Sequence, residues 1–167
     1  RNKLEDLIQI LKNLRSPDGC NWDKKQTHES LIPYLLEETY EVIEAIKTND
    51  YKLLKEELGD LLLHIIFQAE LASEKEKFNI YDSIQNINDK LIKRHPHIFD
   101  NQSDNSWGPG NWESAKQKEK NRKSILDGVP KALPALTKAR RIQEKAATVD
   151  FDWATIKQVY NKIDEEL

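Results

Sequence analysis

The sequence predicts an all-α protein, and three observations support this fold class. Apolar residues recur at the spacing of three and four that places them on one face of a helix. No stretch of useful length alternates apolar and polar residues, as a half-buried strand would. Glycine (5 residues) and proline (6 residues) are sparse, so few positions would interrupt a helix. We therefore expect a bundle of helices.

The first two predicted helices have clear boundaries. Leucine and isoleucine follow helical spacing over residues 4–14, and the turn at residues 16–19 (SPDG) ends that helix. The second helix is predicted to begin near Ser30, which we expect to act as its N-cap. Pro33 then falls in the first turn, where its missing N–H costs nothing, and the helix runs to about Lys47.

The rest of the chain is predicted to be helical with one clear loop. Helices are expected over residues 51–75, 80–93, 112–123, 134–147 and 153–167. His95-Pro96 ends the helix at 80–93, because the residue before a proline disfavours helical backbone angles. Residues 100–110 contain Gly108-Pro109-Gly110 and form the loop. We expect one domain at residues 1–125 and a helical linker region at 126–167.

Composition excludes several classes of protein. No apolar run approaches the roughly 18 residues of a membrane span, so we expect no membrane partner. The first residues do not resemble a charged segment followed by an apolar secretory core. The single cysteine, Cys20, excludes an internal disulfide and a cysteine-based zinc site. This cysteine usage fits a reducing compartment, and we expect a cytoplasmic protein.

The net charge of −3 hides a strong separation of charge along the chain. Residues 37–60 hold eight acidic residues and three lysines, a balance of −5. Residues 113–145 hold ten basic and four acidic residues, a balance of +6. This separation indicates an acidic site that attracts cations and a basic surface that could face phosphates. Two solvated faces of opposite charge are the common alternative.

Two glutamates lie at the edge of the apolar face of the helix predicted from Ser30. With 100° between successive residues, one arc of this helix is apolar. It contains Leu35, Leu36, Thr39, Val42, Ile43 and Ile46. Glu38 and Glu41 form an i, i+3 pair at its rim. Glu37 and Glu44 point toward water.

The helix at 51–75 carries a second acidic pair. Between Leu58 and Phe67 apolar residues occupy almost every direction, which predicts a helix buried all round. Its polar exceptions share one stripe: Glu57, Asp60, His64 and Gln68. A carboxylate is almost never buried without a cation or a metal, and no lysine or arginine interrupts this stripe.

Together the two helices offer four carboxylates for a hard cation. The set is Glu38, Glu41, Glu57 and Asp60. Oxygen ligands favour Mg²⁺, with Mn²⁺ as a possible substitute. An acidic helix pair neutralised by lysines is the alternative, but a second pair inside an apolar helix favours the metal. His64 is expected to be a hydrogen-bonded core residue, because Mg²⁺ prefers oxygen.

These acidic segments resemble the MazG family of nucleoside triphosphate pyrophosphohydrolases. Residues 36–41 (LEETYE) and 56–62 (EELGDLL) are similar to the EExxE and ExxD motifs of that family. The similarity extends to residues 19–23 (GCNWD), 90–99 (KLIKRHPHIF), 133–136 (LPAL) and 151–153 (FDW). It covers nearly the whole chain. Asn21 departs from the proline that is frequent at this position in the family.

The resemblance implies an all-α NTP pyrophosphatase whose bundle is completed by a homodimer. It implies Mg²⁺-dependent hydrolysis of a nucleoside triphosphate to a monophosphate and pyrophosphate. The family's metal ligands fall on the same four carboxylates that helical spacing selects. Residues 159–167 (VYNKIDEEL) look like the start of a second acidic repeat, so the resemblance implies the N-terminal half of a longer, two-domain member.

Four further residues are candidates for the same chemistry. Glu37 lies one turn from Glu41 and could act as a general base, although an exposed glutamate is an equal alternative. Lys90 and Arg94 form an i, i+4 pair that could hold the β- and γ-phosphates, and the resemblance points to the same segment. Trp112 could stack on a nucleobase, as the resemblance also suggests, or serve as a core residue.

Two other functions stay open at this stage. The chain could be a catalytically silent dimerisation or nucleotide-binding half of a two-domain protein whose other half is active. It could instead be a helical module that binds nucleic acid through its basic segment, although the chain as a whole is acidic. Nucleic-acid binding would weaken steeply with salt and would not require Mg²⁺.

Overall fold

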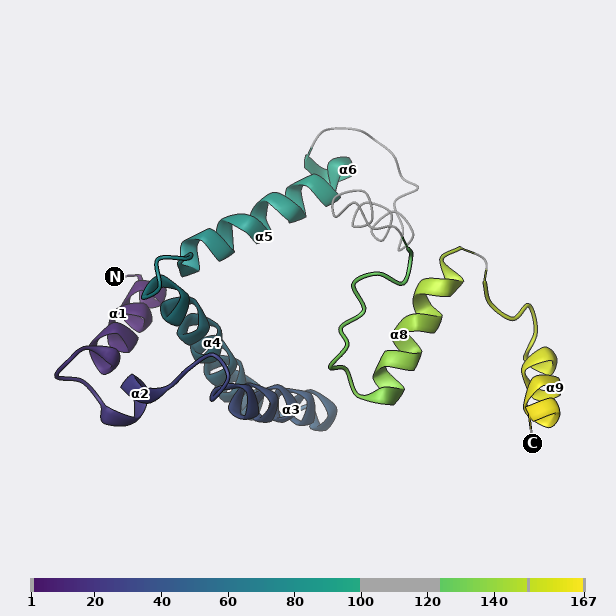
Figure 1. Cartoon of the computed structure of the whole chain (residues 1–167), viewed down its shortest axis with the longest axis horizontal. Coiled ribbons are helices and arrows are strands. Elements are labelled where there is room, and N and C mark those ends of the chain that lie inside the picture. Colours follow the sequence, from purple (N-terminus) through teal and green to yellow (C-terminus); the bar gives the residue numbers. More distant parts are fainter. Residues whose placement is uncertain (1, 100–123, 150, 167) are drawn as a thin grey trace. The chain divides into compact units, whose positions relative to one another are not determined.

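The computed structural model describes residues 2–99, 124–149 and 151–166, and the regular elements in these ranges are all helices (Figure 1). The predicted all-α class is confirmed. Internal contacts divide the chain into two compact units, residues 1–91 and 92–167. In the described ranges, no helix is both long and apolar enough to cross a membrane. The predicted loop at 100–110 and helix at 112–123 lie outside the described residues.

The first unit begins with α1 (Lys3–Arg15), close to the predicted 4–14. The Asn2 side chain accepts a hydrogen bond from the Leu4 N–H at 3.2 Å and caps the helix. A short helix that the periodicity does not predict, α2 (Asn21–Lys25), follows the turn. It has only five residues, too few to display a helical repeat.

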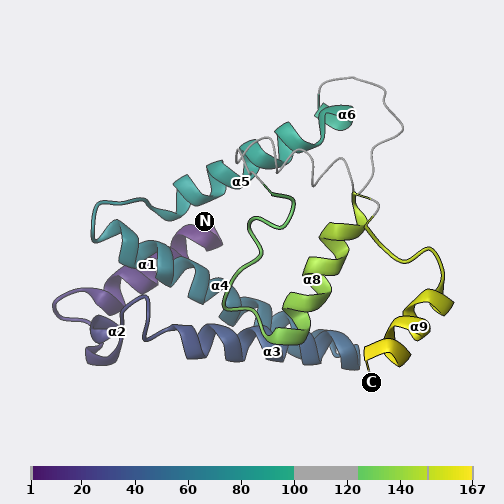
Figure 2. The same cartoon turned by 45° about the vertical axis from the view of Figure 1, so that its right-hand side comes forward.

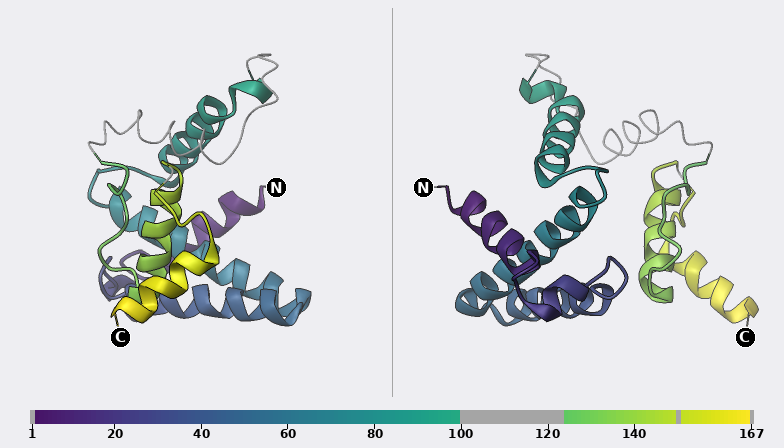
Figure 3. Two further views of the ribbon diagram at one scale, coloured as in Figure 1. Left: turned by 90° about the vertical axis from the view of Figure 1, so that its right-hand side faces the viewer. Right: turned by 60° about the vertical axis from the view of Figure 1, so that its left-hand side comes forward.

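The next two helices, α3 (Ile32–Thr48) and α4 (Tyr51–Ser73), form an antiparallel hairpin and lie side by side in Figures 2 and 3. Asn49 adopts a left-handed conformation (φ 56°) at the end of α3. The Asp50 side chain then accepts hydrogen bonds from the N–H groups of Lys52 and Leu53, both at 3.0 Å. This tight connection fixes which residues of the two helices face each other.

The predicted N-cap at Ser30 is wrong. Leu31 occupies the cap position of α3, and Pro33 lies within the first turn as expected. The Ser30 hydroxyl group instead donates to Gln26 Oε1 at 2.7 Å. A local turn thus takes up the side chain that would otherwise cap the helix.

The core of this unit lies where α1 and the start of α5 (Ile80–Arg94) pack on the second half of α4. Its fully buried large side chains are Leu11, Leu31 and Ile66. The predicted burial of α4 on all sides is wrong, because Leu58 (49%) and Ile65 (49%) remain exposed. On α3, Leu36 of the predicted apolar arc is 54% exposed. Within the described residues of the first unit, only the facing helix covers this end of the hairpin, so the outer side of each helix remains exposed.

The second unit contains α6 (Pro96–Phe99), α8 (Ala135–Ala147) and α9 (Ile156–Glu166) among its described residues. Lys145 is buried, and its ammonium group donates a hydrogen bond to the Ile125 carbonyl at 2.9 Å. The helix expected from residue 153 begins at Ile156, and α8 matches the predicted 134–147 within one residue.

Candidate metal-binding site

Three glutamates from the two hairpin helices converge at one point. Glu38 and Glu41 lie three residues apart on α3, and Glu57 faces them from α4. One carboxylate oxygen from each side chain lies within 4.8 Å of the others. Glu57 is buried, with 8% of its surface exposed. The hairpin therefore brings one acidic residue of α4 to an acidic pair of α3 that is distant in the sequence.

Burial and crowding raise the pKa of two of these carboxyl groups, Glu38 and Glu57. Burial raises the pKa of Glu38 to about 7, helped by a hydrogen bond with Glu41 and by the negative charges of Glu41, Asp60 and Glu57. Burial also raises the pKa of Glu57, and repulsion from Glu41 and Asp60 adds to it. A nearby cation stabilises the charged form of such a carboxylate, so the crowded cluster favours the binding of a cation.

No basic side chain in the described ranges neutralises the three glutamates. The ion pairs found there lie elsewhere, such as Arg15 with Glu74 and Arg140 with Glu144. The donor atoms at the cluster are all carboxylate oxygens, which a hard divalent cation prefers over a soft metal. The cluster therefore fits a site for such an ion.

Comparison with known proteins decides the family. Residues 26–99, which contain the whole cluster, match the MazG nucleotide pyrophosphohydrolase domain. A Thermotoga maritima protein named nucleoside triphosphate pyrophosphohydrolase/pyrophosphatase MazG is 50% identical over 165 residues, 98% of this chain and 64% of that protein. The chain therefore contains a MazG domain at residues 26–99.

Other relatives agree with this assignment. An Escherichia coli K12 protein named nucleoside triphosphate pyrophosphohydrolase is 44% identical over 172 residues, 99% of this chain and 65% of that protein. The Bacillus subtilis protein YabN, named as uncharacterized, is 46% identical over 139 residues, 81% of this chain and 28% of that protein. The chain thus spans just under two thirds of the length of the first two relatives.

The fourth predicted ligand, Asp60, lies beside the three glutamates in this MazG domain. It follows Glu57 by three residues on α4, and its side chain is exposed. Its charge raises the pKa of both Glu38 and Glu57, so it lies within their electrostatic reach. It does not belong to the group whose oxygens lie within 4.8 Å of one another.

Glu37 and Lys90, the other predicted site residues of the first unit, are not part of this group. Glu37 is exposed on α3. Lys90 and Arg94 lie one turn apart near the end of α5, where Arg94 is buried and has interaction partners of its own. Trp112 lies outside the described residues. The roles of all four stay predictions.

Two rings lie next to the cluster, and the sequence analysis did not connect them. Tyr34 precedes Glu38 by one helical turn on α3, and His64 follows Asp60 by one turn on α4. Their rings are nearly parallel, with 6.4 Å between centroids and 11° between planes. The i, i+4 spacing to an acidic residue on each helix is the signal that could have revealed them.

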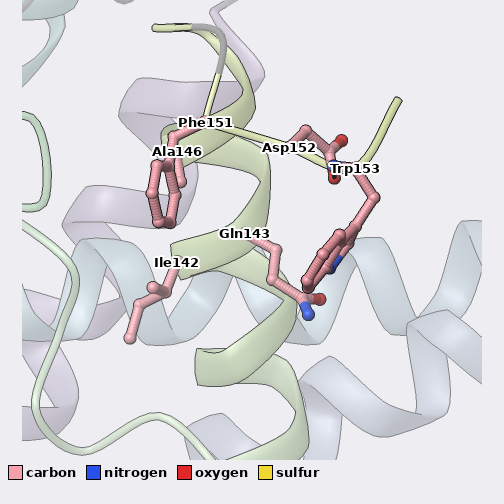
Figure 4. A pocket seen from close by; sticks show the side chains of 6 residues that line it. All are labelled: Ile142, Gln143, Ala146, Phe151, Asp152 and Trp153. Atoms are coloured by element: carbon pink, nitrogen blue, oxygen red, sulfur yellow. Dashed lines mark hydrogen bonds between the residues drawn. The ribbon is translucent and has the colours of Figure 1, made fainter. Parts of the chain in front are cut away.

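A separate cavity of about 370 Å³ lies in the second unit. Ile142, Gln143 and Ala146 of α8 line one side of it, and Phe151, Asp152 and Trp153 line the other (Figure 4). Its described lining is largely apolar and includes one acidic group, Asp152. None of the predicted site residues lines this cavity.

Proposed function

We propose that this MazG chain hydrolyses nucleoside triphosphates to nucleoside monophosphates and pyrophosphate with Mg²⁺ bound at the acidic cluster. The observation that carries this proposal is the convergence of Glu38, Glu41 and Glu57, with no neutralising basic side chain among the residues that the structure describes. The names of the Thermotoga and Escherichia relatives support the reaction class. Asp60 completes the proposed ligand set from the edge of the cluster.

The proposed chemistry needs charge neutralisation and an aligned water molecule. Bound Mg²⁺ would supply positive charge at the phosphoryl oxygens and lower the pKa of a coordinated water. The glutamates of α3 and α4 would hold the ion between them and fix its position. The water would attack the α-phosphorus, the bond to the bridging oxygen would break, and pyrophosphate would leave. Glu37 is the proposed acceptor of the proton from this water.

The remaining site residues complete the proposal for the substrate. Lys90 and Arg94 are proposed to hold the β- and γ-phosphates, because a guanidinium group can bind two phosphate oxygens at once. Trp112 is proposed to stack on one face of the base. We assign residues 1–125 to the catalytic domain and residues 126–167 to a linker and the start of a second repeat.

We further propose that the chain works as a homodimer in the cytoplasm. Leu36, Tyr40 and Ile43 form an exposed apolar stripe on α3, and α4 exposes a similar stripe. Exposed apolar stripes of this kind are typical of surfaces that bind another protein. Cys20 is an exposed free thiol, which suits a reducing compartment.

A single assay tests the reaction. The full chain is incubated with each of the four common NTPs and Mg²⁺, and the products are separated. We expect a monophosphate and pyrophosphate, and we expect no products after Mg²⁺ is removed with a chelator. A diphosphate and orthophosphate would show that the cleaved bond is wrong. Nucleotide and Mg²⁺ binding without any product would favour the catalytically silent half.

Two variants test whether the cluster performs the reaction. Glu57→Gln keeps the shape of the side chain and removes its charge, and we expect turnover to fall at least about 100-fold. Glu44→Gln, an exposed residue on α3, is the matched control and should retain activity. Mg²⁺ alone should raise the thermal midpoint of the wild type, because it binds the folded state, and should not do so for Glu57→Gln.

A further inference from the structure

Three aromatic rings continue the line of the acidic cluster along the hairpin. Tyr34 lies one turn, about 6 Å, before Glu38 on α3, and His64 lies one turn after Asp60 on α4. Because the two helices are antiparallel, both rings lie on the same side of the carboxylates. Trp22 of α2 meets the Tyr34 ring edge-to-face, with 5.8 Å between centroids and 78° between planes.

Two of these rings, Trp22 and Tyr34, are exposed although large aromatic side chains are usually covered by packing. Trp22 is 50% exposed and Tyr34 is 40% exposed, although both are large aromatic side chains held in a fixed arrangement. Neighbours on two other helices orient Tyr34, namely Trp22 on α2 and His64 on α4. An exposed and preoriented ring is suited to stack on a flat ligand, because little conformational entropy is lost on binding.

His64 is buried at a cost to stability. Only 9% of its surface is exposed, and its Nδ1 atom has no hydrogen-bond partner in the described part of the chain. A buried polar atom without a partner destabilises the fold, and a phenylalanine or leucine at this position would avoid that cost. The expectation of a hydrogen-bonded core histidine is therefore wrong for Nδ1. What the His64 ring does provide is a parallel stacking contact with the Tyr34 ring.

We propose that Trp22, Tyr34 and His64 form the nucleoside end of the site, where the base of a nucleotide stacks on the exposed Tyr34 and Trp22 rings. His64 is a positioning residue that holds the Tyr34 ring from its buried side. The inference rests on the proposed function, since it assumes that the phosphates lie at the carboxylates one turn away. Every base has an aromatic face, so this subsite would accept both purines and pyrimidines.

Calorimetric titrations of the full chain in Mg²⁺ test this subsite with three probes. AMP and CMP carry a base, and inorganic tripolyphosphate does not. We expect Tyr34→Leu to weaken AMP and CMP binding about tenfold, the effect of losing one stacked base. Binding of tripolyphosphate should change less than about twofold. Tyr51→Leu, a tyrosine of the first unit that is 78% exposed, is the matched control.

The role of His64 is tested by two replacements. His64→Phe keeps a ring against Tyr34 and removes the unpartnered nitrogen, so we expect AMP affinity close to the wild type and a thermal midpoint that is no lower. His64→Ala removes the ring and should weaken AMP binding about as much as Tyr34→Leu. Equal loss of affinity in both variants would overturn the positioning role.

The outcomes separate this inference from the proposed reaction. If the wild type hydrolyses NTPs but Tyr34→Leu binds AMP and CMP normally, the subsite is wrong and the reaction stands. If the wild type binds AMP through Tyr34 but produces no pyrophosphate, the subsite stands and the reaction is wrong. If Tyr34→Leu weakens tripolyphosphate and AMP equally, the ring supports the phosphate site, and the nucleoside subsite is overturned.

Discussion

At the scale of single residues, the contribution of the acidic cluster to folding stability depends on pH. The folded-state pKa of Glu38 is about 7, above its ordinary value of 4.5. Between these values the folded protein binds more protons than the unfolded chain, so stability falls as pH rises through this window. The lowered pKa of the buried His64 acts in the opposite direction below its ordinary value of 6.5. The contribution of Glu38 must therefore be measured as a difference between variants.

We predict that Glu38→Gln removes this contribution. In metal-free protein, the thermal midpoint of the variant should exceed that of the wild type by a growing margin between pH 4.5 and about 7. Thermal unfolding of both proteins across this range measures the margin, and Glu44→Gln should show none. A constant margin would mean that Glu38 ionises normally. Saturating Mg²⁺ should favour the wild type, because the ion binds the deprotonated carboxylate.

Two glycines of the first unit should respond in opposite directions to alanine. A methyl group on Gly19 would lie 2.2 Å from the Leu14 carbonyl oxygen and 2.4 Å from that of Asn13. Backbone atoms cannot move aside, so Gly19→Ala should lower stability by at least about 2 kcal/mol. Gly59 has nothing within 4 Å of such a methyl group, and Gly59→Ala should stabilise the monomeric chain by about 1 kcal/mol. Chemical denaturation measures the stability change of both variants. If Gly19→Ala is as stable as the wild type, the close approach of Gly19 to the backbone of Asn13 and Leu14 is contradicted.

At the scale of elements, Arg15 joins three helices of the first unit. From the end of α1, its guanidinium group binds both carboxylate oxygens of Glu74 just beyond α4, at 2.6 and 2.7 Å. It also donates to the Asp23 carbonyl of α2 and lies 5.2 Å from the centre of the Phe67 ring. This fork holds α2 and therefore Trp22 near the hairpin. Helical spacing does not reveal such a contact between distant positions.

We predict that Arg15→Ala lowers the free energy of unfolding by about 2 kcal/mol, since it removes charged hydrogen bonds and packing on Phe67. Arg140→Ala breaks an exposed pair within α8 and should cost less than about 1 kcal/mol. The pair with Arg15 lowers the pKa of Glu74 below 4.5. Its contribution is therefore present above pH 4.5 and is lost as pH falls through the lowered pKa. Urea denaturation of the wild type and both variants, at neutral and at acidic pH, measures these losses. An equal loss of stability in Arg15→Ala and Arg140→Ala at neutral pH would contradict the prediction.

At the scale of the whole molecule, we expect the exposed side of the α3–α4 hairpin to mediate association. Leu58, Leu62 and Ile65 follow one another at i, i+4 and i+7 on α4, and each is at least 39% exposed. We predict that the wild type is a dimer by light scattering and that Ile65→Lys shifts it toward the monomer. Leu136→Lys, at an isolated site that is 87% exposed, should leave the mass unchanged. A monomeric wild type would contradict the proposed dimer.

Patterns in the sequence predict the helical class, the approximate limits of the long helices and the acidic residues to examine. Those features depend on local periodicity, capping and proline geometry, which a single sequence records. Tertiary structure alone decided that Glu57 meets Glu38 and Glu41 while Asp60 lies outside the group. It also decided that the outer faces of α3 and α4 stay exposed. Contacts between helices depend on their pairing and rotation, and the periodicity of one helix does not contain that information.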